Sequence, residues 1–461
     1  MKVLLINPQI NSINTRLPES LNRAEGVYPP LGLAYIGAVL EEGGHEVSIL
    51  DMPALNLSLR QINEKMLQEK PDIVGITVMS PLIRNALEIA RIAKEAGLTV
   101  VMGGPHLSAY PEETLSHDFV DYGITGEGEH SMLKLADALA SGGAVDGIEG
   151  LVYKKDRRVC MNEPAIVEDL DSLPFPARYL LPAERYSSVI AMHPFTTMMS
   201  GRGCPFDCGF CFKQPSDKKI RRRSASNIVD EMEEVVEKYR VKEIMFYDDT
   251  FTLQRDHVVN ICNEILDRGL DVKWEAPTRA DCIDKELLKI MQKAGCIRLR
   301  YGVESGDEEI LRLMRKGITI KLVKDVFEWT REAGIETFAY FIIGYAKENA
   351  QSIKRTISLA KELNPDWVMF TVAMPYPCTQ LYEMAQKEGL LDGDYWAEIT
   401  LGSRDERMPY LVADADEWVR KAYRSFYLRP SFVVKKLLKL RNLDTLRKYI
   451  RGMLGVIRFK V

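Results

Sequence analysis

The chain has 461 residues, of which 46% are hydrophobic, and carries a formal net charge of −5. This length predicts two or three domains with substantial cores, and the charge does not indicate a nucleic-acid-binding protein. Eight cysteines are few for this length and suggest no disulfide framework, so a reduced cytoplasmic setting fits them. The N-terminus begins in an apolar segment without the features of a secretory signal, and no apolar run reaches the ~18–20 residues that span a bilayer.

The first third of the chain alternates short apolar segments with helical ones. Strands are expected at residues 3–6, 47–50, 73–78, 100–102 and 122–124, and helices at 33–42 and 84–96. A βα repeat of this kind predicts a doubly wound parallel sheet, Rossmann-like or flavodoxin-like. Ligands bind such sheets at the carboxyl ends of the strands.

The first strand is followed by Asn-Pro-Gln-Ile-Asn-Ser and not by the G-x-G-x-x-G of dinucleotide-binding domains. Ser80-Pro81-Leu82 matches the S-x-L motif of the cobalamin-binding fold, and Gly103-Gly104 matches its paired glycines. This region therefore resembles a cobalamin-binding domain. The resemblance implies cobalamin-binding residues at the strand ends, namely Pro8, Asp51, Ser80, Leu82, Gly103, Gly104, Gly126 and Glu127.

The D-x-H-x-x-G motif of cobalamin-binding domains, whose histidine ligates cobalt, is absent. His106 follows the paired glycines and so stands on the wrong strand for that ligand. The resemblance thus implies base-off cobalamin without a histidine on cobalt. The alternative is a flavodoxin-like domain that binds nothing.

Residues 146–190 form a connector that contains prolines and aspartates, and a three-cysteine motif follows it. Cys204, Cys208 and Cys211 have the spacing C-x3-C-x2-C. Iron–sulfur clusters usually take four cysteines, so three thiolates can hold three irons of a [4Fe–4S] cluster and leave the fourth iron open. A zinc site is the alternative, but zinc sites use four ligands in paired units and no second pair follows.

At this motif the chain resembles the radical S-adenosylmethionine (SAM) superfamily, in which SAM chelates the open iron. Further strands are expected at residues 196–200, 243–247, 272–277, 297–303, 338–343 and 367–374. They predict a partial (β/α)6 barrel with functional residues at the strand carboxyl ends. The resemblance implies SAM contacts at Phe210, Asp248, Asp249, Arg279, Glu304, Ser305 and Gly344.

The resemblance implies roles for these SAM contacts. Glu304 and Ser305 resemble the superfamily's ribose and carboxylate contacts, and the segment ending at Gly344 resembles the motif whose backbone edges the adenine. Asp248 or Asp249 would accept a hydrogen bond from the SAM amine, although the segment Tyr247–Thr250 lacks the glycine pair of the superfamily motif. Arg279 would form a bidentate ion pair with the SAM carboxylate.

After the sixth strand, Tyr376 and Cys378 are candidates for facing the substrate. For Cys378, the alternative is an inert, half-buried thiol.

The C-terminal tail from Val419 to Val461 contains thirteen Lys and Arg and one Asp. Its apolar residues recur at helical spacing, namely Val433, Val434, Leu437, Leu438, Leu440, Leu443, Leu446 and Ile450. Such a helix can lie on an anionic membrane, which would favour a lipid-like substrate, or it can cap the barrel through its apolar face.

The order of the two halves resembles the B12-binding radical SAM group, which includes methylases and the anaerobic Mg-protoporphyrin cyclase. Tyr28–Leu33 and the Gly126-Glu127-Gly128-Glu129 segment resemble further signatures of the group, expected near the corrin. The expected domains are residues 1–145 (cobalamin-binding), 146–190 (linker), 191–400 (radical SAM barrel) and 401–461 (basic helical extension).

The resemblance implies a C-methyltransferase that acts on an unactivated carbon through a 5′-deoxyadenosyl radical and methylcobalamin. The alternatives are a cyclase or ring-rearranging enzyme without methyl transfer, and a non-catalytic Fe–S or cobalamin-binding sensor. The expected partners are a small-molecule, lipid or peptide substrate and a reductant such as flavodoxin or ferredoxin. Nucleic acid is a weaker candidate because Arg221-Arg222-Arg223 is only one short basic run. The expected location is the cytoplasm, with membrane contact through the C-terminal helix if the tail binds lipid.

Overall fold

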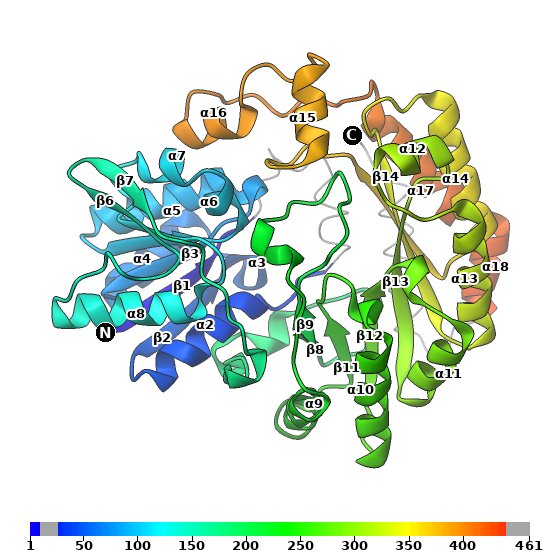
Figure 1. Cartoon of the computed structure of the whole chain (residues 1–461), viewed down its shortest axis with the longest axis horizontal. Helices are drawn as coiled ribbons and strands as arrows, with labels where there is room; N and C mark the ends of the chain where they lie inside the picture. The colour runs from blue at the N-terminus through cyan, green and yellow to red at the C-terminus, as the bar shows by residue number, and fades with distance from the viewer. Residues whose placement is uncertain (10–25, 439–461) are drawn as a thin grey trace.

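The computed structural model describes residues 1–9 and 26–438. Two α/β units lie side by side, and the segment that follows the last barrel strand crosses from the second unit to the first (Figure 1). Within the described residues, no helix is both long enough and apolar enough to cross a membrane.

The first unit is built on a seven-stranded sheet in the order β2-β1-β3-β4-β5-β6-β7. Its first five strands pair in parallel and are β1 (Lys2–Asn7), β2 (Glu46–Asp51), β3 (Ile73–Thr77), β4 (Thr99–Gly103) and β5 (Tyr122–Ile124). The helices are α2 (Leu31–Glu42), α3 (Met52–Leu55), α4 (Leu59–Glu69), α5 (Ile83–Glu95), α6 (Pro105–Ala109), α7 (Pro111–Leu115) and α8 (Gly128–Ser141).

Strand β1 shows why this sheet is covered on both faces. Leu4 and Ile6 pack in one apolar core with residues of α4 and α5. Val3 and Leu5, which alternate with them, pack in another core with residues of α2 and α8. A continuous apolar strand is the pattern of a parallel sheet with helices on both sides.

The range expected as a linker contains two strands. β6 (Leu151–Lys155) pairs antiparallel with β5, and β7 (Arg158–Met161) pairs antiparallel with β6. The first sheet therefore continues to Met161, because an antiparallel hairpin needs only a short turn to join the sheet edge. The rest of this range holds three short 3-10 helices, at Leu170–Ser172, Arg178–Leu180 and Ala183–Arg185.

The second unit is a curved, all-parallel sheet of six strands in the order β15-β14-β13-β12-β11-β8. Its strands are β8 (Phe195–Met198), β11 (Glu243–Phe246), β12 (Lys273–Thr278), β13 (Cys296–Glu304), β14 (Glu336–Ile343) and β15 (Trp367–Val372). Its helices are α9 (Ala225–Tyr239), α10 (Arg255–Asp267), α11 (Lys285–Lys293), α12 (Glu308–Leu313), α13 (Ile320–Glu332) and α14 (Ala350–Leu363). They lie on the outer side of the sheet (Figure 1), which confirms the predicted partial (β/α)6 barrel.

Buried charges occupy the inner side of this sheet near the starts of its strands. The Nη1 atom of Arg298 lies 2.9 Å from Glu243 Oε1 and 2.5 Å from Glu275 Oε2. Because buried carboxylates are costly without partners, these pairs keep that end of the barrel closed and charge-compensated. Functional residues of such barrels lie at the opposite end, where the carboxyl termini of the strands meet.

In the described part of the chain, four helices follow the barrel: α15 (Gln380–Lys387), α16 (Tyr395–Leu401), α17 (Ala415–Tyr427) and α18 (Pro430–Leu438). Val419, Ala422 and Phe426 of α17 are buried in the barrel core. The choice between membrane contact and capping of the barrel by the apolar face of residues 433–450 stays a prediction. Residues 439–461, with Leu440, Leu443, Leu446 and Ile450, lie outside the described residues.

Candidate active site

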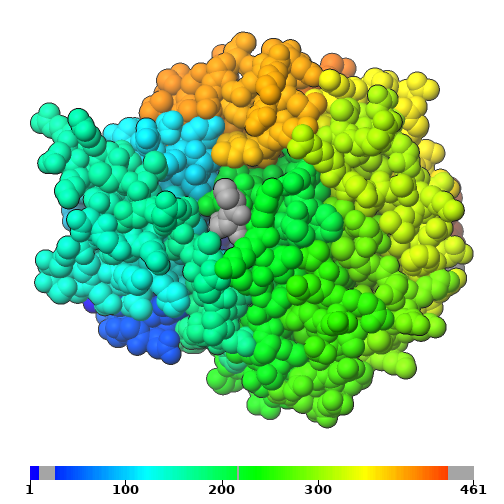
Figure 2. Space-filling model, viewed as in Figure 1, coloured from blue at the N-terminus to red at the C-terminus, as the bar shows by residue number. Residues whose placement is uncertain are grey.

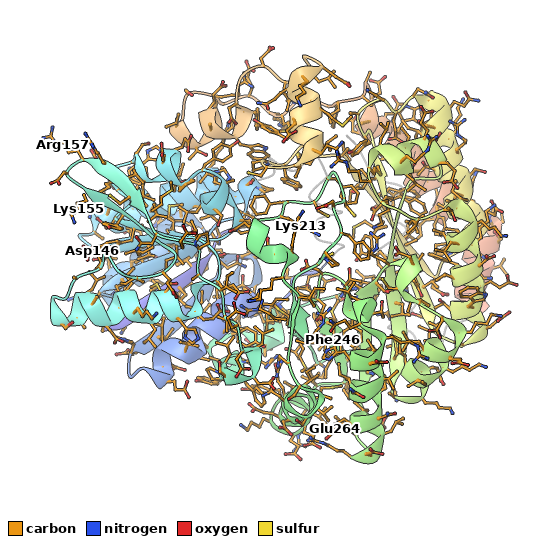
Figure 3. The ribbon with its side chains drawn as sticks, viewed as in Figure 1. Asp146, Lys155, Arg157, Lys213, Phe246 and Glu264 are labelled. Atoms are coloured by element: carbon orange, nitrogen blue, oxygen red, sulfur yellow. The ribbon has the colours of Figure 1, made fainter. Side chains whose placement is uncertain are left out.

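A short β-ladder closes the base of the cysteine loop. β9 (Gly201–Arg202) pairs antiparallel with β10 (Arg221–Arg222), and residues 203–220 loop out between them. The Cys204 amide donates to Asp217 O at 2.8 Å. Gly203 has a φ of 96°, and a Cβ at this position would lie 2.2 Å from Lys219 O, so only glycine fits. Lys213, labelled in Figure 3, donates from Nζ to Cys204 O at 3.0 Å across the loop.

The three predicted cluster ligands lie on this loop, and two of their thiols are in hydrogen-bond contact. Cys204 is buried, with its Sγ 3.9 Å from Thr250 Oγ1. A hydrogen bond between the thiols of Cys208 and Cys211 lowers the pKa of Cys208 to about 6 and raises that of Cys211. Among residues 1–9 and 26–438, no three His, Cys, Asp or Glu side chains are arranged to hold a metal ion.

Two cations lie beside these thiols and favour thiolate ligands. Arg279 Nη1 is 3.4 Å from Cys208 Sγ, and its guanidinium carbon is 3.7 Å from the centroid of the Phe206 ring. Lys316 Nζ lies 2.7 Å from Glu304 Oε1 and 5.8 Å from the centroid of the Phe210 ring. Positive charge stabilises thiolates. Three soft thiol donors on one loop with adjacent cations therefore fit an iron–sulfur cluster.

The two aspartates proposed for the SAM amine differ in exposure. Asp248 is buried and accepts hydrogen bonds from the backbone amide of Ser200, at 2.8 Å, and from its hydroxyl. Burial raises the pKa of Asp248 to about 6. Asp249 is exposed. Asp249 is thus the carboxylate that is open to a ligand, and Asp248 holds the end of β8.

The other predicted SAM contacts make internal hydrogen bonds. Arg279 pairs with both carboxylate oxygens of Asp281, at 2.9 Å each, so its fork is already engaged. Ser305 Oγ lies 3.2 Å from Thr356 Oγ1. The Gly344 amide donates to Glu348 Oε2 at 2.6 Å, and burial raises the pKa of Glu348 to about 7. Sequence reasoning missed Glu348, whose only signal is a carboxylate four residues after the predicted adenine-site glycine.

In the first unit, the predicted cobalamin residues lie at strand ends as expected. Gly104 has a φ of 108°, and a Cβ there would lie 2.9 Å from Val78 O. Ser80 Oγ is 3.1 Å from His106 Nδ1, whose Nε2 is 2.8 Å from Thr400 Oγ1 of α16. Burial lowers the pKa of His106 to about 3, so this residue is neutral and joins the first unit to α16.

The remaining predicted cobalamin residues are mostly enclosed. Pro8 and Leu82 are buried, and Gly103 follows the buried part of β4. Asp51 is fully buried and accepts a hydrogen bond from Asn7 Nδ2 at 2.9 Å, and burial raises its pKa. Gly126 has a φ of 77°, and Glu127 forms ion pairs with Arg221 and Arg202 of the cysteine-loop base.

The candidates after the last barrel strand lie at the junction of the two units. Tyr376 stacks on Trp396 of α16, with 6.2 Å between ring centroids and an angle of 18°. Cys378 is exposed and has a φ of 58°, a conformation that favours glycine. In the space-filling view, the first unit, the barrel and the segment after β15 meet near the centre of this face (Figure 2).

An aromatic cluster that sequence reasoning did not assemble lies at the carboxyl end of β11. Tyr247 is 38% exposed, and burial raises its pKa. The Arg300 guanidinium carbon is 5.8 Å from the centroid of this ring, and the ring of Tyr28 meets it edge-on at 6.2 Å. Tyr28 belongs to the Tyr28–Leu33 segment, so the first unit contributes to this aromatic cluster.

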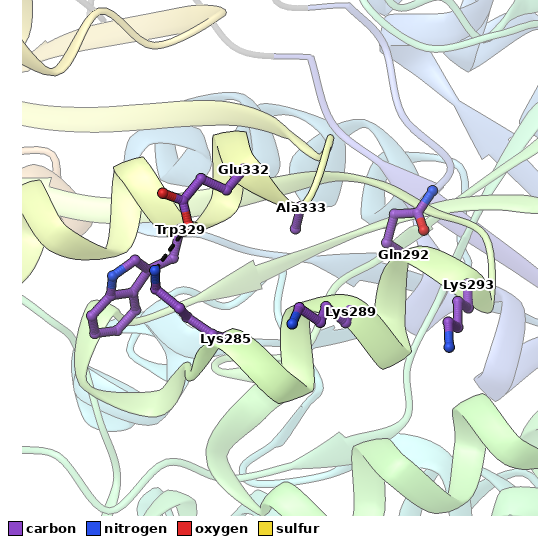
Figure 4. A pocket seen from close by; sticks show the side chains of 7 residues that line it. All are labelled: Lys285, Lys289, Gln292, Lys293, Trp329, Glu332 and Ala333. Carbon is purple, nitrogen blue, oxygen red and sulfur yellow. Dashed lines mark hydrogen bonds and ion pairs between the residues drawn. The ribbon is translucent and has the colours of Figure 1, made fainter.

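A pocket of about 240 Å³ lies elsewhere, on the outer helices α11 and α13. Lys285, Lys289 and Trp329 line it, and Lys285 pairs with Glu332 at 2.9 Å (Figure 4). The pocket shares no residue with the cysteine loop or with the aromatic cluster, so we do not assign it to the active site.

A three-cysteine loop after the first strand of a six-stranded half-barrel, held against a doubly wound domain, defines the class of radical SAM proteins that carry an N-terminal B12-type domain. Residues 198–360 match the model of the radical SAM superfamily, and residues 21–136 match that of the B12 binding domain. The chain belongs to the B12-binding radical SAM enzyme family.

Whole-chain relatives support this assignment. The chain is 35% identical to an uncharacterized methyltransferase of Pyrococcus horikoshii, over 99% of this chain and 98% of that protein. It is 30% identical to an anaerobic magnesium-protoporphyrin IX monomethyl ester cyclase of Rubrivivax gelatinosus, over 98% of this chain and 82% of that protein. The fold matches the radical SAM methyltransferase TsrM of Kitasatospora setae with a TM-score of 0.72 and 19% identity, covering 93% of this chain and 89% of TsrM.

Proposed function

We propose that the protein is a cobalamin-dependent radical SAM methyltransferase that acts on a carbon atom. The observation that carries the proposal is the attachment of the cysteine loop to the first unit, in which Arg202 Nη2 lies 2.6 Å from Glu129 Oε1. The cluster loop and the strand ends of the first unit would then open onto one space. The methyltransferase of Pyrococcus horikoshii, related over the whole chain, supports the same proposal.

In this proposal Cys204, Cys208 and Cys211 hold three irons of the cluster. Ser80, Gly103 and Gly104 leave room for the cobalamin tail, with the cofactor base-off because the buried His106 is engaged by Ser80 and Thr400. When bound, the cluster with SAM supplies a carbon-centred radical and cobalamin supplies a methyl group. The protein provides binding, orientation and electrostatics.

The chain's own residues have distinct tasks at the SAM site. Arg279 and Lys316 offset the negative charge of the thiolates. Asp249, which is exposed, accepts a hydrogen bond from the SAM amine. Glu348 holds the amides of Gly344 and Tyr345 at 2.6 and 3.1 Å, which fixes the backbone at the end of β14. These hydrogen bonds hold the backbone beside the proposed SAM site in one conformation.

The substrate would lie against the aromatic cluster of Tyr28, Tyr247 and Arg300, to which both units contribute. Aromatic rings and one guanidinium suit a flat or partly apolar molecule with a polar group. We place the enzyme in the cytoplasm with a reductant such as flavodoxin or ferredoxin. Contact with a membrane would depend on residues 439–461.

The test is transfer of label from SAM that carries a deuterated methyl group. The reconstituted enzyme is incubated under anaerobic conditions with this SAM and an extract of its own cells, and products are compared by mass spectrometry. A product that gains one labelled methyl group supports methyl transfer. A product with unchanged carbon count, formed with SAM cleavage, would instead favour a cyclase, the activity named for the Rubrivivax relative.

A further inference from the structure

The base of the cysteine loop carries two arginines on facing strands. Arg202 of β9 and Arg221 of β10 are direct partners in the two-stranded ladder. Gly203 and Cys204 follow Arg202 immediately, and residues 203–220 form the loop. Any group that holds both arginines therefore fixes the position of the whole loop.

Two carboxylates of the first unit hold these arginines. Glu127 accepts from Arg221 through both oxygens, at 2.7 and 2.8 Å, and its Oε1 lies 3.2 Å from Arg202 Nη1. Glu129 Oε1 lies 2.6 Å from Arg202 Nη2. The exposed fractions of these four side chains lie between 5% and 18%, so water screens the pairs little. Bidentate carboxylate–guanidinium pairs also fix geometry.

The backbone around Glu127 keeps its carboxylate in one orientation. Its Oε2 accepts from the Val167 amide at 2.6 Å, and Arg221 Nη1 donates to Val167 O at 2.6 Å. Gly126 has a φ of 77°, and a Cβ there would lie 2.3 Å from Ala165 O. The chain thus passes too close to residue 165 for any side chain but glycine, which aims Glu127 at the loop base.

We propose that Glu127 is a positioning residue that fixes the distance and orientation of the cluster loop relative to the cobalamin-binding unit. The proposal rests on the proposed function, because that function needs both cofactor sites to face one space. It assigns the Gly126–Glu129 segment a role in joining the two units, where the sequence alone suggested contact with the corrin.

The first test uses the full-length protein without cofactors and measures amide hydrogen exchange. Glu127→Gln keeps the side-chain size but removes the charge, and roughly tenfold faster exchange is expected in residues 203–220. Glu168→Gln is the matched control, because Glu168 pairs with Lys219 of the same loop at 2.6 Å but is 62% exposed. The Glu168→Gln variant should exchange at the wild-type rate in residues 203–220. Equal exchange in the Glu127→Gln variant and wild type would overturn the proposal.

Exchange in strands β13 and β14 shows whether the variant is folded, since these strands are remote from the substitution in sequence and belong to the barrel core. If the Glu127→Gln variant exchanges fast everywhere, Glu127→Asp, which retains the charge, serves instead. It should show an intermediate rate in residues 203–220 with a protected barrel. A rate equal to that of wild type would contradict the proposal.

The second test distinguishes a role in positioning the cluster loop from a general contribution to the stability of the fold. In reconstituted protein, electron paramagnetic resonance reports the magnetic coupling between the reduced cluster and cob(II)alamin, which depends on their separation. Glu127→Gln should retain iron and cobalamin but weaken this coupling, and Glu168→Gln should not. Unchanged coupling would overturn the positioning role. If wild-type protein binds no cobalamin, the proposed function fails while the exchange result stands by itself.

Discussion

The Nη1 atom of Arg279 lies 3.4 Å from the Sγ atom of Cys208, one of the three predicted cluster ligands. The guanidinium is held there by Asp281, at 2.9 Å, and by the Phe206 ring beneath it. Sequence reasoning expected Arg279 to pair with the SAM carboxylate, and that contact stays a prediction. The structure places Arg279 against a predicted cluster ligand.

Arg279→Gln should therefore change the cluster more than SAM binding. Loss of a positive charge beside a thiolate disfavours the reduced, more negative cluster, so its midpoint potential should fall by on the order of 40 mV. Potentiometric titration of the reconstituted protein measures this change. The Km for SAM should change less than threefold.

Lys218→Gln is the control for the Arg279 variant, because it removes a positive charge from the same loop. Lys218 pairs with Asp207 at 2.7 Å, and both side chains are more than half exposed. Solvent screens this pair, so its removal should leave the potential unchanged. Equal shifts in the two variants would show that Arg279 has no special position.

His106 gives a prediction about pH. It is buried, and burial lowers its pKa from 6.5 to about 3, so the folded protein keeps it neutral while the unfolded chain binds a proton below pH 6.5. This contribution to stability is present above pH 6.5 and is lost as the pH falls. Between pH 7 and pH 5 the loss should be about 2 kcal/mol.

The His106→Phe variant isolates this effect. At pH 7 it should be less stable than wild type by about 2 kcal/mol, because Ser80 and Thr400 lose a buried hydrogen-bond partner. Since phenylalanine does not titrate, the gap in free energy of unfolding should nearly close by pH 5. Urea denaturation of the cofactor-free protein at both pH values measures it, and a gap independent of pH would contradict the assignment of a neutral His106.

Cys378 tests whether an exposed thiol at the junction has a chemical role. Its φ of 58° costs a residue with a Cβ roughly 1 kcal/mol, which glycine avoids. Cys378→Gly should thus raise the free energy of unfolding by up to ~1 kcal/mol, and Cys378→Ser should not. If the glycine variant is stable but no longer forms product, the thiol takes part in the reaction.

The placement of the site follows from local patterns that the sequence displays directly. Apolar segments alternating with helices predicted both parallel sheets. Because the strand ends of one parallel sheet meet at one edge, the same pattern predicted where the site residues would gather. Cys204, Cys208 and Cys211 needed no tertiary information, since they share one loop. Gly104 was also found from its motif, and its φ of 108° explains the glycine.

The partners of the polar side chains could not be predicted in the same way. Glu127 pairs with Arg221 across 94 residues of sequence, and His106 meets Thr400 across 294. Such contacts depend on how the two units dock, and neither periodicity nor spacing carries that information. The pairing of Arg279 with Asp281 is local, two residues apart in sequence, but residue spacing alone does not indicate which carboxylate an arginine will bind.

The central claim is that the three-cysteine loop and the B12-type unit work as one enzyme. The most direct measurement is the yield of 5′-deoxyadenosine from anaerobically reconstituted protein that carries both iron and cobalamin, incubated with SAM and a strong reductant. Wild type should form 5′-deoxyadenosine, and Cys208→Ala, with its cobalamin retained, should form none. Equal yields from the two proteins, or a wild type that binds no cobalamin under these conditions, would contradict it.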